Sequence, residues 1–471
     1  MQTSNFTIQK SKGRPIRAAL LIVLPLCILF FASLVIYTAV RLNSITADPL
    51  SEIENRLALT ASKQSETEYL HTWEWTAFPS EPEPQAATIE KNIYARSAIL
   101  VDAQTGAILL EKNADELIPP ASMTKVVAMY TAFKAIESGL IQLDDTVDLP
   151  PESWAVNIPA GSSLMFLGKD QKVTVRELLA GMATVSGNDA AIAIAFYVSG
   201  SIEAFVDRMN SEIKMLGLTQ THFVEPSGLS EFNVTTAREF VQFAMHYINE
   251  YPEALTAFHS LTSFSYPKQE NLPQGHSYPP VFQRSTNKLL ETLEGCDGLK
   301  TGFIYESGYN FALTAHRKGT RFISVSMGGP GSNSREGIFF RNKDGENLME
   351  WAFAHFKTIQ GTHIESFPVL VWQGKRSAIR AIPAGKSIFT VPKSLITESS
   401  PVEIEIRVQS APWITAPVHA GDSIGSIEYL YKGIVVHTIP LVADRNIEKA
   451  GSLQIGIDFL AEMIAGLALK K

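Results

Sequence analysis

The chain reads Pro119-Pro120-Ala121-Ser122-Met123-Thr124-Lys125 where two prolines end one segment and a helical run begins. Apolar residues follow at helix-like spacing, at Val126, Val127, Met129, Tyr130 and Phe133. Because residues three apart share one face of a helix, Lys125 can reach the Ser122 hydroxyl. A serine hydroxyl is a poor nucleophile until a nearby base takes its proton, so this pair is a candidate nucleophile and base.

The Ser-x-x-Lys spacing alone does not identify a site. It recurs at Ser211–Lys214, Ser265–Lys268 and Ser285–Lys288. Ser122 differs from these serines because it follows a proline break and begins a long amphipathic helix. At a helix start its backbone N–H also points outward, where it can stabilise an oxyanion.

Two further short motifs follow in chain order. Ser186-Gly187-Asn188 offers a second hydroxyl to relay a proton and an amide to bind a peptide backbone. Lys300-Thr301-Gly302 occurs once in the chain, and its cation and hydroxyl suit a carboxylate. Its glycine allows close backbone approach, and the N–H of Phe303 can donate to an oxyanion. Each motif alone is a weak signal, but the three in this order form a specific constellation.

Strand signals flank the region that holds these motifs. They predict a hairpin of Ser97–Asp102 and Ala107–Glu111, and a meander of Asp297–Phe303, Tyr309–Ala315 and Phe322–Met327 with a turn at Lys318-Gly319. Residues 130–290 are mostly helical in pattern. The arrangement predicts an α+β domain whose sheet joins its first and last strands.

A different sequence pattern begins at about Ile364. Short alternating segments separated by turn residues recur at Val369–Trp372, Ile388–Val391, Val402–Val408, Ile424–Tyr431 and Ile434–Ile439. This pattern predicts a small all-β sandwich domain.

Together the motifs resemble those of the low-molecular-mass penicillin-binding proteins that act as D-alanyl-D-alanine carboxypeptidases. The resemblance also rests on the flanking patterns Val101-Asp102-Ala103-Gln104-Thr105-Gly106, Asn287-Lys288-Leu289-Leu290, Asp297-Gly298-Leu299 and Gly308-Tyr309-Asn310. It runs from about Ile93 to Phe356 and continues at Ala416-Pro417-Val418 and Pro440-Leu441-Val442. It implies a penicillin-binding, β-lactamase-like transpeptidase domain, an antiparallel sheet flanked by helices, followed by the β-sandwich domain.

The resemblance implies a role for each motif residue. Ser122 would be the acylated nucleophile, Lys125 its base and Ser186 the proton relay. The substrate would be bound by Asn188, Lys300, Thr301, Gly302 and Phe303. The implied reaction removes the terminal D-alanine from peptidoglycan stem pentapeptides through a Ser122 acyl-enzyme, with β-lactam antibiotics as covalent inhibitors. No cofactor or metal is expected, and no His-Glu-x-x-His motif occurs.

Many members of the family carry histidine after Lys-Thr-Gly, whereas this chain has Phe303. Either Arg335 or Arg341 matches the arginine that the family places near the site. The ammonium of Lys300 is expected to lower the pKa of Lys125, which would make it a better base.

Three other functions fit parts of the same pattern. A DD-endopeptidase that cuts peptidoglycan cross-links uses the same residues, although the β-rich C-terminal domain favours the carboxypeptidase. A class A β-lactamase needs a glutamate followed four residues later by asparagine, but Glu225 is followed at that position by Leu229. A non-catalytic wall-binding protein is opposed by the intact motifs.

The N-terminal end carries a membrane signal. Ala18–Val40 is a run of 23 residues without a charge, which is long enough to cross a bilayer. Four basic residues precede the run and a single arginine, Arg41, follows it, which favours a cytoplasmic N-terminus. We therefore expect a single-pass inner (plasma) membrane anchor with the catalytic domain on the periplasmic side. A cleaved signal peptide is the alternative, but no cleavage site is obvious.

These signals divide the chain into six predicted segments: a cytoplasmic tail (1–17), a transmembrane anchor (18–40), a stalk (41–92), the catalytic domain (93–362), the β-sandwich domain (363–446) and an amphipathic segment (447–471). The last segment either lies on the membrane or packs on the body. The net charge of −8 argues against a nucleic-acid partner. Cys27 lies in the apolar run and cannot pair with Cys296, so no disulfide is expected.

Overall fold

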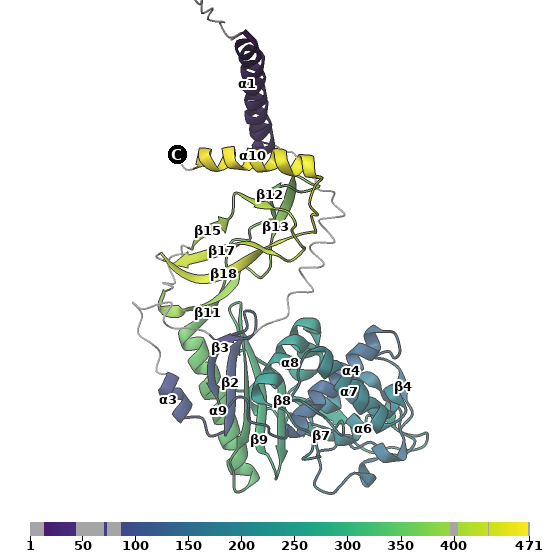
Figure 1. Ribbon diagram of the computed structural model, residues 1–471. Coiled ribbons are helices and arrows are strands. Elements are labelled where there is room, and N and C mark those ends of the chain that lie inside the picture. The colour runs from purple at the N-terminus through teal and green to yellow at the C-terminus, as the bar shows by residue number, and fades with distance from the viewer. Residues whose placement is uncertain (1–13, 44–69, 73–85, 396–403, 432, 470–471) are drawn as a thin grey trace, which may run out of the picture. The chain divides into compact units, whose positions relative to one another are not determined.

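The computed structural model describes residues 14–43, 70–72, 86–395, 404–431 and 433–469 (Figure 1). Most of the predicted cytoplasmic tail and of the predicted stalk lies outside the described residues. The chain forms two compact units. Of the described residues, the larger unit holds 70–72, 86–361 and 388–395, and the smaller holds 14–43, 362–387, 404–431 and 433–469.

A six-stranded sheet forms the centre of the larger unit, with strand order β1-β3-β2-β10-β9-β8. In that order the strands are His71–Thr72, Ala107–Lys112, Ser97–Asp102, Thr320–Gly329, Gly308–Arg317 and Cys296–Ile304. The predicted hairpin and meander are both confirmed. β10 pairs antiparallel with β2, so the sheet joins the first and last strands as predicted. β8 forms one edge of this sheet.

Helices cover both faces of this sheet (Figure 1). Side chains alternate along a strand, so Ile99 and Val101 of β2 face one hydrophobic cluster while Ala98 and Leu100 face another. The first cluster is completed by α4 (Thr124–Glu137), α5 (Val175–Thr184), α6 (Asn188–Ser199), α7 (Ile202–Met215) and α8 (Ala237–Glu250). The second is completed by α9 (Ser334–His355), next to α3 (Ala86–Lys91). Two small two-stranded antiparallel sheets, β4 (Thr146–Val147) with β5 (Val173–Thr174) and β6 (Ser263–Tyr266) with β7 (Val281–Arg284), contribute side chains to the first cluster.

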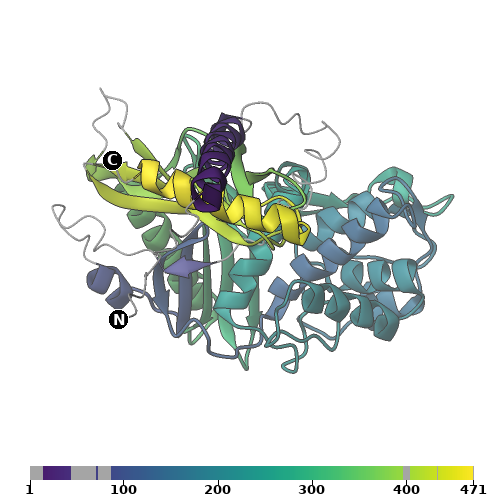
Figure 2. The same ribbon diagram turned by 45° about the horizontal axis from the view of Figure 1, so that its top comes forward.

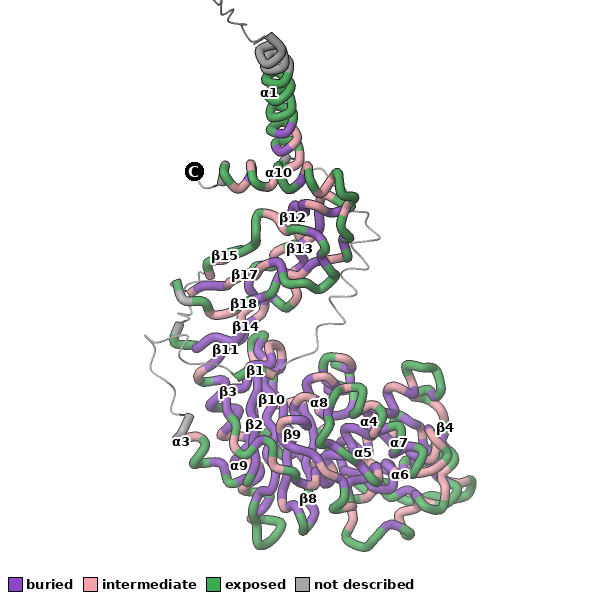
Figure 3. The backbone as a smooth tube through the Cα atoms, in the orientation of Figure 1, coloured by how far each residue is buried: buried purple, intermediate pink, exposed green. Residues whose placement is uncertain are grey.

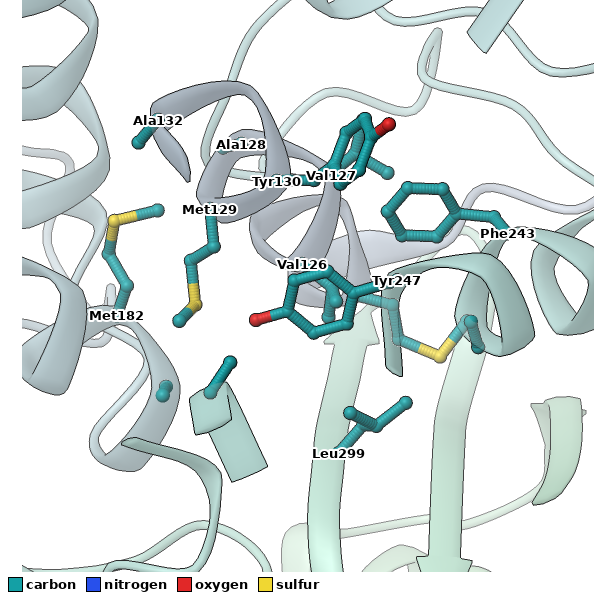
Figure 4. Packing of buried hydrophobic residues seen from close by; sticks show 14 of the residues in the cluster. Val126, Val127, Ala128, Met129, Tyr130, Ala132, Met182, Phe243, Tyr247 and Leu299 are labelled. Atoms are coloured by element: carbon teal, nitrogen blue, oxygen red, sulfur yellow. The ribbon is translucent and has the colours of Figure 1, made fainter. Parts of the chain in front are cut away.

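The helix α4 lies at the centre of the first cluster. Eleven of its fourteen residues are buried. Figure 4 shows Val126, Met129 and Tyr130 among side chains from other elements, including Met182 and Tyr247. A helix enclosed on nearly all sides holds its first turn rigidly, which matters because Lys125 lies in that turn.

The smaller unit contains an all-β domain, as predicted. Six strands form one curled sheet in the order β15-β17-β18-β13-β12-β16. In that order they are Glu405–Ser410, Ser423–Tyr431, Ile434–Ala443, Ala378–Pro383, Phe367–Trp372 and Trp413–Thr415. The predicted segment Ile388–Val391 does form a strand, β14 (Ile388–Pro392), but it pairs with β11 (Phe356–Gln360) in the larger unit. There the Thr390 hydroxyl donates to the buried Asp102 carboxylate at 2.9 Å.

Two helices complete the smaller unit, α1 (Arg14–Asn43) and α10 (Ser452–Leu469). Among the described residues, α1 is the one unbroken helix long and apolar enough to cross a membrane, over Val23–Leu42. Most of its residues over this span are exposed (Figure 3). α10 lies across one end of α1 (Figures 1 and 2). The buried Asp458 of α10 accepts hydrogen bonds from Tyr37 Oη at 2.6 Å and from Gln373 N at 2.8 Å.

Candidate active site

The Ser122 hydroxyl and the Lys125 ammonium meet at the start of α4. Ser122 lies in a short 3-10 turn, η3 (Ala121–Met123), that leads directly into the helix. Ala121 has φ +51°, a left-handed conformation that is strained for a residue with a Cβ and that turns the chain sharply into the helix. Lys125 Nζ lies 3.0 Å from Ser122 Oγ, so the structure brings the predicted pair into hydrogen-bonding contact.

Lys125 is fully buried and is held by three partners. Besides Ser122, its Nζ donates to Asn188 Oδ1 at 2.6 Å and to the carbonyl oxygen of Ser227. Burial lowers the pKa of Lys125 to about 7, against the opposing effect of the Glu225 and Asp189 charges. A pKa near neutrality suits a general base.

The expected cause of this pKa shift was wrong, although its direction was right. Desolvation, not the charge of Lys300, is the largest influence that lowers the pKa of Lys125. Lys300 is also buried, and burial lowers its own pKa well below the usual value, with the charges of Lys125 and Arg341 adding to the effect.

The second motif lies between α5 and α6. Ser186 has φ +61°, and its buried hydroxyl has no hydrogen-bond partner among the described residues. Asn188 begins α6 and reaches Lys125, as described above. The buried carboxylate of Asp189 accepts four backbone N–H groups, from Met165, Phe166, Leu167 and Ala190. Asp189 thus fixes the loop that precedes α5 against the first turn of α6.

The third motif lies on β8, at the edge of the six-stranded sheet. Lys300 Nζ donates to the Thr301 carbonyl at 2.9 Å, and the Thr301 hydroxyl donates to Thr286 Oγ1 at 2.9 Å. Gly302 faces the nucleophile, because a Cβ atom there would lie 3.2 Å from Ser122 N. The absence of a side chain at residue 302 therefore lets β8 approach the serine.

Phe303 lies on the same strand, and an arginine from α9 lies near it. Phe303 is 38 % exposed, and its ring centroid lies 4.4 Å from that of Tyr309. Of the two candidate arginines, the structure places Arg341 near the strand. Arg341 is buried and donates to the Thr286 carbonyl at 3.2 Å, whereas Arg335 is exposed on the first turn of α9.

A sequence profile of the D-alanyl-D-alanine carboxypeptidase family matches residues 83–331, more than half of the chain. The chain belongs to this family. A second profile, for the C-terminal domain of penicillin-binding protein 5, matches residues 361–449. The carboxypeptidase family is therefore matched along both the motif-bearing region and the β-domain.

Individual members of the carboxypeptidase family agree with this assignment. The chain is 32% identical to the D-alanyl-D-alanine carboxypeptidase DacC of Escherichia coli (strain K12), over 80% of this chain and 89% of that protein. It is 30% identical to DacF of Bacillus subtilis (strain 168), over 76% of this chain and 87% of that protein. The crystal structure of penicillin-binding protein 5 from Haemophilus influenzae superposes with a TM-score of 0.64 at 29% identity, covering 78% of this chain and all of that one.

The segment with Ser227 and Gly228 also belongs to this carboxypeptidase site, and it was not predicted from the sequence. Ser227 supplies the carbonyl that accepts from Lys125, and Gly228 lies against Ala121 and Ser122. Proline and glycine at residues 226 and 228 do signal a turn. Nothing local in the sequence says which part of the fold that turn contacts.

Proposed function

We propose that this chain is a serine-type D-Ala-D-Ala carboxypeptidase that releases the terminal D-alanine of peptidoglycan stem pentapeptides through an acyl-enzyme on Ser122. The observation that carries the proposal is the buried Lys125 amine, 3.0 Å from the Ser122 hydroxyl and with a pKa of about 7. At neutral pH a large fraction of this amine is uncharged and can take a proton.

Acylation begins when Ser122 Oγ attacks the carbonyl carbon of the penultimate D-alanine. Lys125 takes the hydroxyl proton, and the oxyanion is stabilised by the backbone N–H groups of Ser122 and Phe303. When the tetrahedral intermediate collapses, the peptide C–N bond breaks and the leaving nitrogen receives a proton. Ser186 relays that proton from Lys125, a role that agrees with its buried hydroxyl having no other described partner.

Substrate recognition is assigned to the β8 edge and α6. Lys300 and Thr301 bind the terminal carboxylate, and Asn188 binds the peptide amide. Gly302 leaves room for the substrate backbone beside Ser122. A water molecule then hydrolyses the ester, with Lys125 again taking a proton.

β-Lactams should acylate the same serine, which gives a direct test. Intact-mass spectrometry after penicillin treatment should detect one adduct on the wild type and none on Ser122→Ala. Ser211→Ala is a matched control, since Ser211 has the same spacing to a lysine but is exposed; it should retain the adduct. A wild type without an adduct would overturn the assignment of Ser122.

The reaction itself is tested with a stem pentapeptide. The wild type should release free D-alanine, and Ser122→Ala should not. Cleavage of cross-linked peptide dimers in place of D-alanine release would favour a DD-endopeptidase. We favour the carboxypeptidase because the match to a Pseudomonas aeruginosa D-alanyl-D-alanine endopeptidase covers only 50% of this chain, whereas that to DacC covers 80%.

We further propose that α1 anchors the catalytic unit to the periplasmic face of the inner membrane. The apolar run of α1 and the basic residues before it support this orientation. The exposed apolar side chains of α10, at Leu453, Phe459, Leu460, Met463 and Leu467, lie on the helix that crosses the end of α1 and suit a membrane surface. Protease added to spheroplasts should degrade the catalytic unit if this orientation is right and leave it intact if it is reversed.

A further inference from the structure

The turn at residues 225–228, between α7 and α8, lies against both members of the Ser–Lys pair. Ser227 accepts a hydrogen bond from Lys125 through its carbonyl oxygen. Gly228 has φ +84°, and a Cβ atom there would lie 1.9 Å from Ala121 O and 2.8 Å from Ser122 N. No other residue type fits at Gly228, so the position of this turn relative to the pair is tightly defined.

One carboxylate holds the turn together. Glu225 Oε2 accepts from the backbone N–H of Ser227 at 2.7 Å and from its hydroxyl at 2.5 Å. Glu225 Oε1 accepts from Gly228 N at 2.6 Å, Ser230 N at 3.3 Å and Asn233 Nδ2 at 2.8 Å. A carboxylate has about four lone-pair sites, so these five donors saturate it. Glu225 is therefore occupied as an acceptor and is not placed to activate a water molecule.

The same carboxylate is connected to α4 through Asn233. Asn233 is fully buried; its amide nitrogen donates to Glu225 and also to Thr124 Oγ1, at 3.3 Å. Its Oδ1 accepts from Val224 N at 2.7 Å. The network thus ends on Thr124, directly beside Lys125, as well as on the Ser227 carbonyl.

We infer that Glu225 is a positioning residue for Lys125, because it fixes the turn whose Ser227 carbonyl orients the lysine amine toward the Ser122 hydroxyl. The inference rests on the proposed function of Ser122 and Lys125. It gives Glu225 a role different from that of a deacylating glutamate, since it acts through the turn and not on water or substrate.

The charge of Glu225 adds an effect that a purely structural residue would not have. The charged groups that face Lys125 are Glu225 on the turn, Asp189 on α6 and Lys300 on β8. The negative charge of Glu225 raises the pKa of Lys125, against the larger lowering by burial. Removing that charge should therefore lower the pKa of Lys125 further and leave more of the amine unprotonated at acidic pH.

The experiment measures D-alanine release against pH for the full-length wild type, Glu225→Gln, Glu225→Asp and the control Glu231→Gln. Glu231 is exposed and close in sequence, so its variant loses the same charge outside the network. For Glu225→Gln we expect kcat to fall by about tenfold or more, because the Lys125 amine is no longer held in the right orientation. We also expect the rise of kcat/KM on the acid side of its pH profile (the acid limb) to move to lower pH by about half a unit. Glu231→Gln should match the wild type in both.

Glu225→Asp keeps the charge but shortens the side chain. It should lower kcat while the acid limb stays at the wild-type pH. If Glu225→Gln does not fold, as judged by thermal unfolding, the aspartate variant decides, and wild-type kcat in it would overturn the inference. A folded Glu225→Gln with the wild-type acid limb would also overturn it. A wild type that releases no D-alanine would instead refute the proposed function on which the inference rests.

Discussion

Gly302 faces Ser122 so closely that a Cβ atom on the glycine would lie 3.2 Å from the Ser122 nitrogen and 2.6 Å from the oxygen of Pro120. This contact joins the edge strand β8 to the turn η3, and it fixes where the Lys-Thr-Gly motif lies relative to the nucleophile. The glycine is therefore needed for a close backbone approach, as its place in the motif suggested.

Gly302→Ala should push β8 away from the nucleophile. Backbone atoms cannot yield as a flexible side chain can, so the strand must shift. We expect the rate of penicillin acylation to fall on the order of 10²-fold, the effect of misplacing reacting groups by about 1 Å. The measurement is stopped-flow acylation with a chromogenic β-lactam. Gly451→Ala, at an exposed glycine with open space around it, is the control and should acylate at the wild-type rate.

Acylation should depend on pH through Lys125. The neutral amine is the base, so the acylation rate should rise with pH and reach half its plateau near pH 7, the pKa of Lys125. Lys125→Met removes the base while filling most of the space, and it should abolish measurable acylation. A wild-type acylation rate that is flat between pH 5 and pH 9 would contradict Lys125 as the base.

The same lysine should affect folding stability in a defined pH window. Its pKa falls from the ordinary value of 10.5 to about 7 in the folded state. Between these values the unfolded chain binds more protons than the folded chain, so the free energy of unfolding should rise with pH across the window. Below about pH 7 both states are protonated and this dependence disappears. Comparing urea denaturation of wild type and Lys125→Met at several pH values isolates the contribution of Lys125 to the pH dependence of the free energy of unfolding.

Much of the fold and of the site follows from local sequence signals. Alternating apolar residues predict β2, β3, β8, β9 and β10 closely, and the three motifs meet as their spacing and order suggest. What the sequence could not supply are contacts between segments far apart in the chain. The Ser227 carbonyl lies 102 residues from Lys125, and its backbone atoms carry no sequence signature at all.

The choice between Arg335 and Arg341 illustrates the same limit. Both lie on α9, and their identity alone gives no preference. Six residues along a helix amount to about 600° of rotation, so the two side chains point in different directions. Only the packing of α9 on the sheet shows that Arg341 is buried and reaches Thr286. Likewise, the burial that lowers the pKa of Lys125 depends on tertiary packing and not on the neighbouring cation.

Arg341 should contribute to substrate binding, and Arg335 should not. Arg341 donates to the carbonyl of Thr286, whose hydroxyl accepts from Thr301. Arg341→Lys keeps a positive charge but loses the planar guanidinium group and its fixed N–H donors. Thr286 and Thr301 should therefore be less well positioned. We expect KM for the pentapeptide to rise by about tenfold, with a smaller change in kcat. Arg335→Lys on the same helix should leave both constants unchanged, and an equal effect of the two variants would refute this role for Arg341.

Asp189 should support both stability and the placement of Asn188. Its buried carboxylate accepts the backbone N–H groups of Met165, Phe166 and Leu167 as well as that of Ala190. Asp189→Ala would leave these donors unsatisfied, and each buried unsatisfied group costs about 1–3 kcal/mol. We therefore expect the free energy of unfolding to fall by at least ~3 kcal/mol.

The same variant should also slow acylation, because Asn188 is the next residue and accepts from Lys125 at 2.6 Å. Thermal and urea denaturation give the stability change, and chromogenic β-lactam acylation gives the effect on the site. Asp207→Ala, at an exposed aspartate on α7, is the matched control and should change neither. Since Asp189 fixes the loop and the helix start together, a variant that loses stability but acylates at the wild-type rate would separate the two roles and contradict the second.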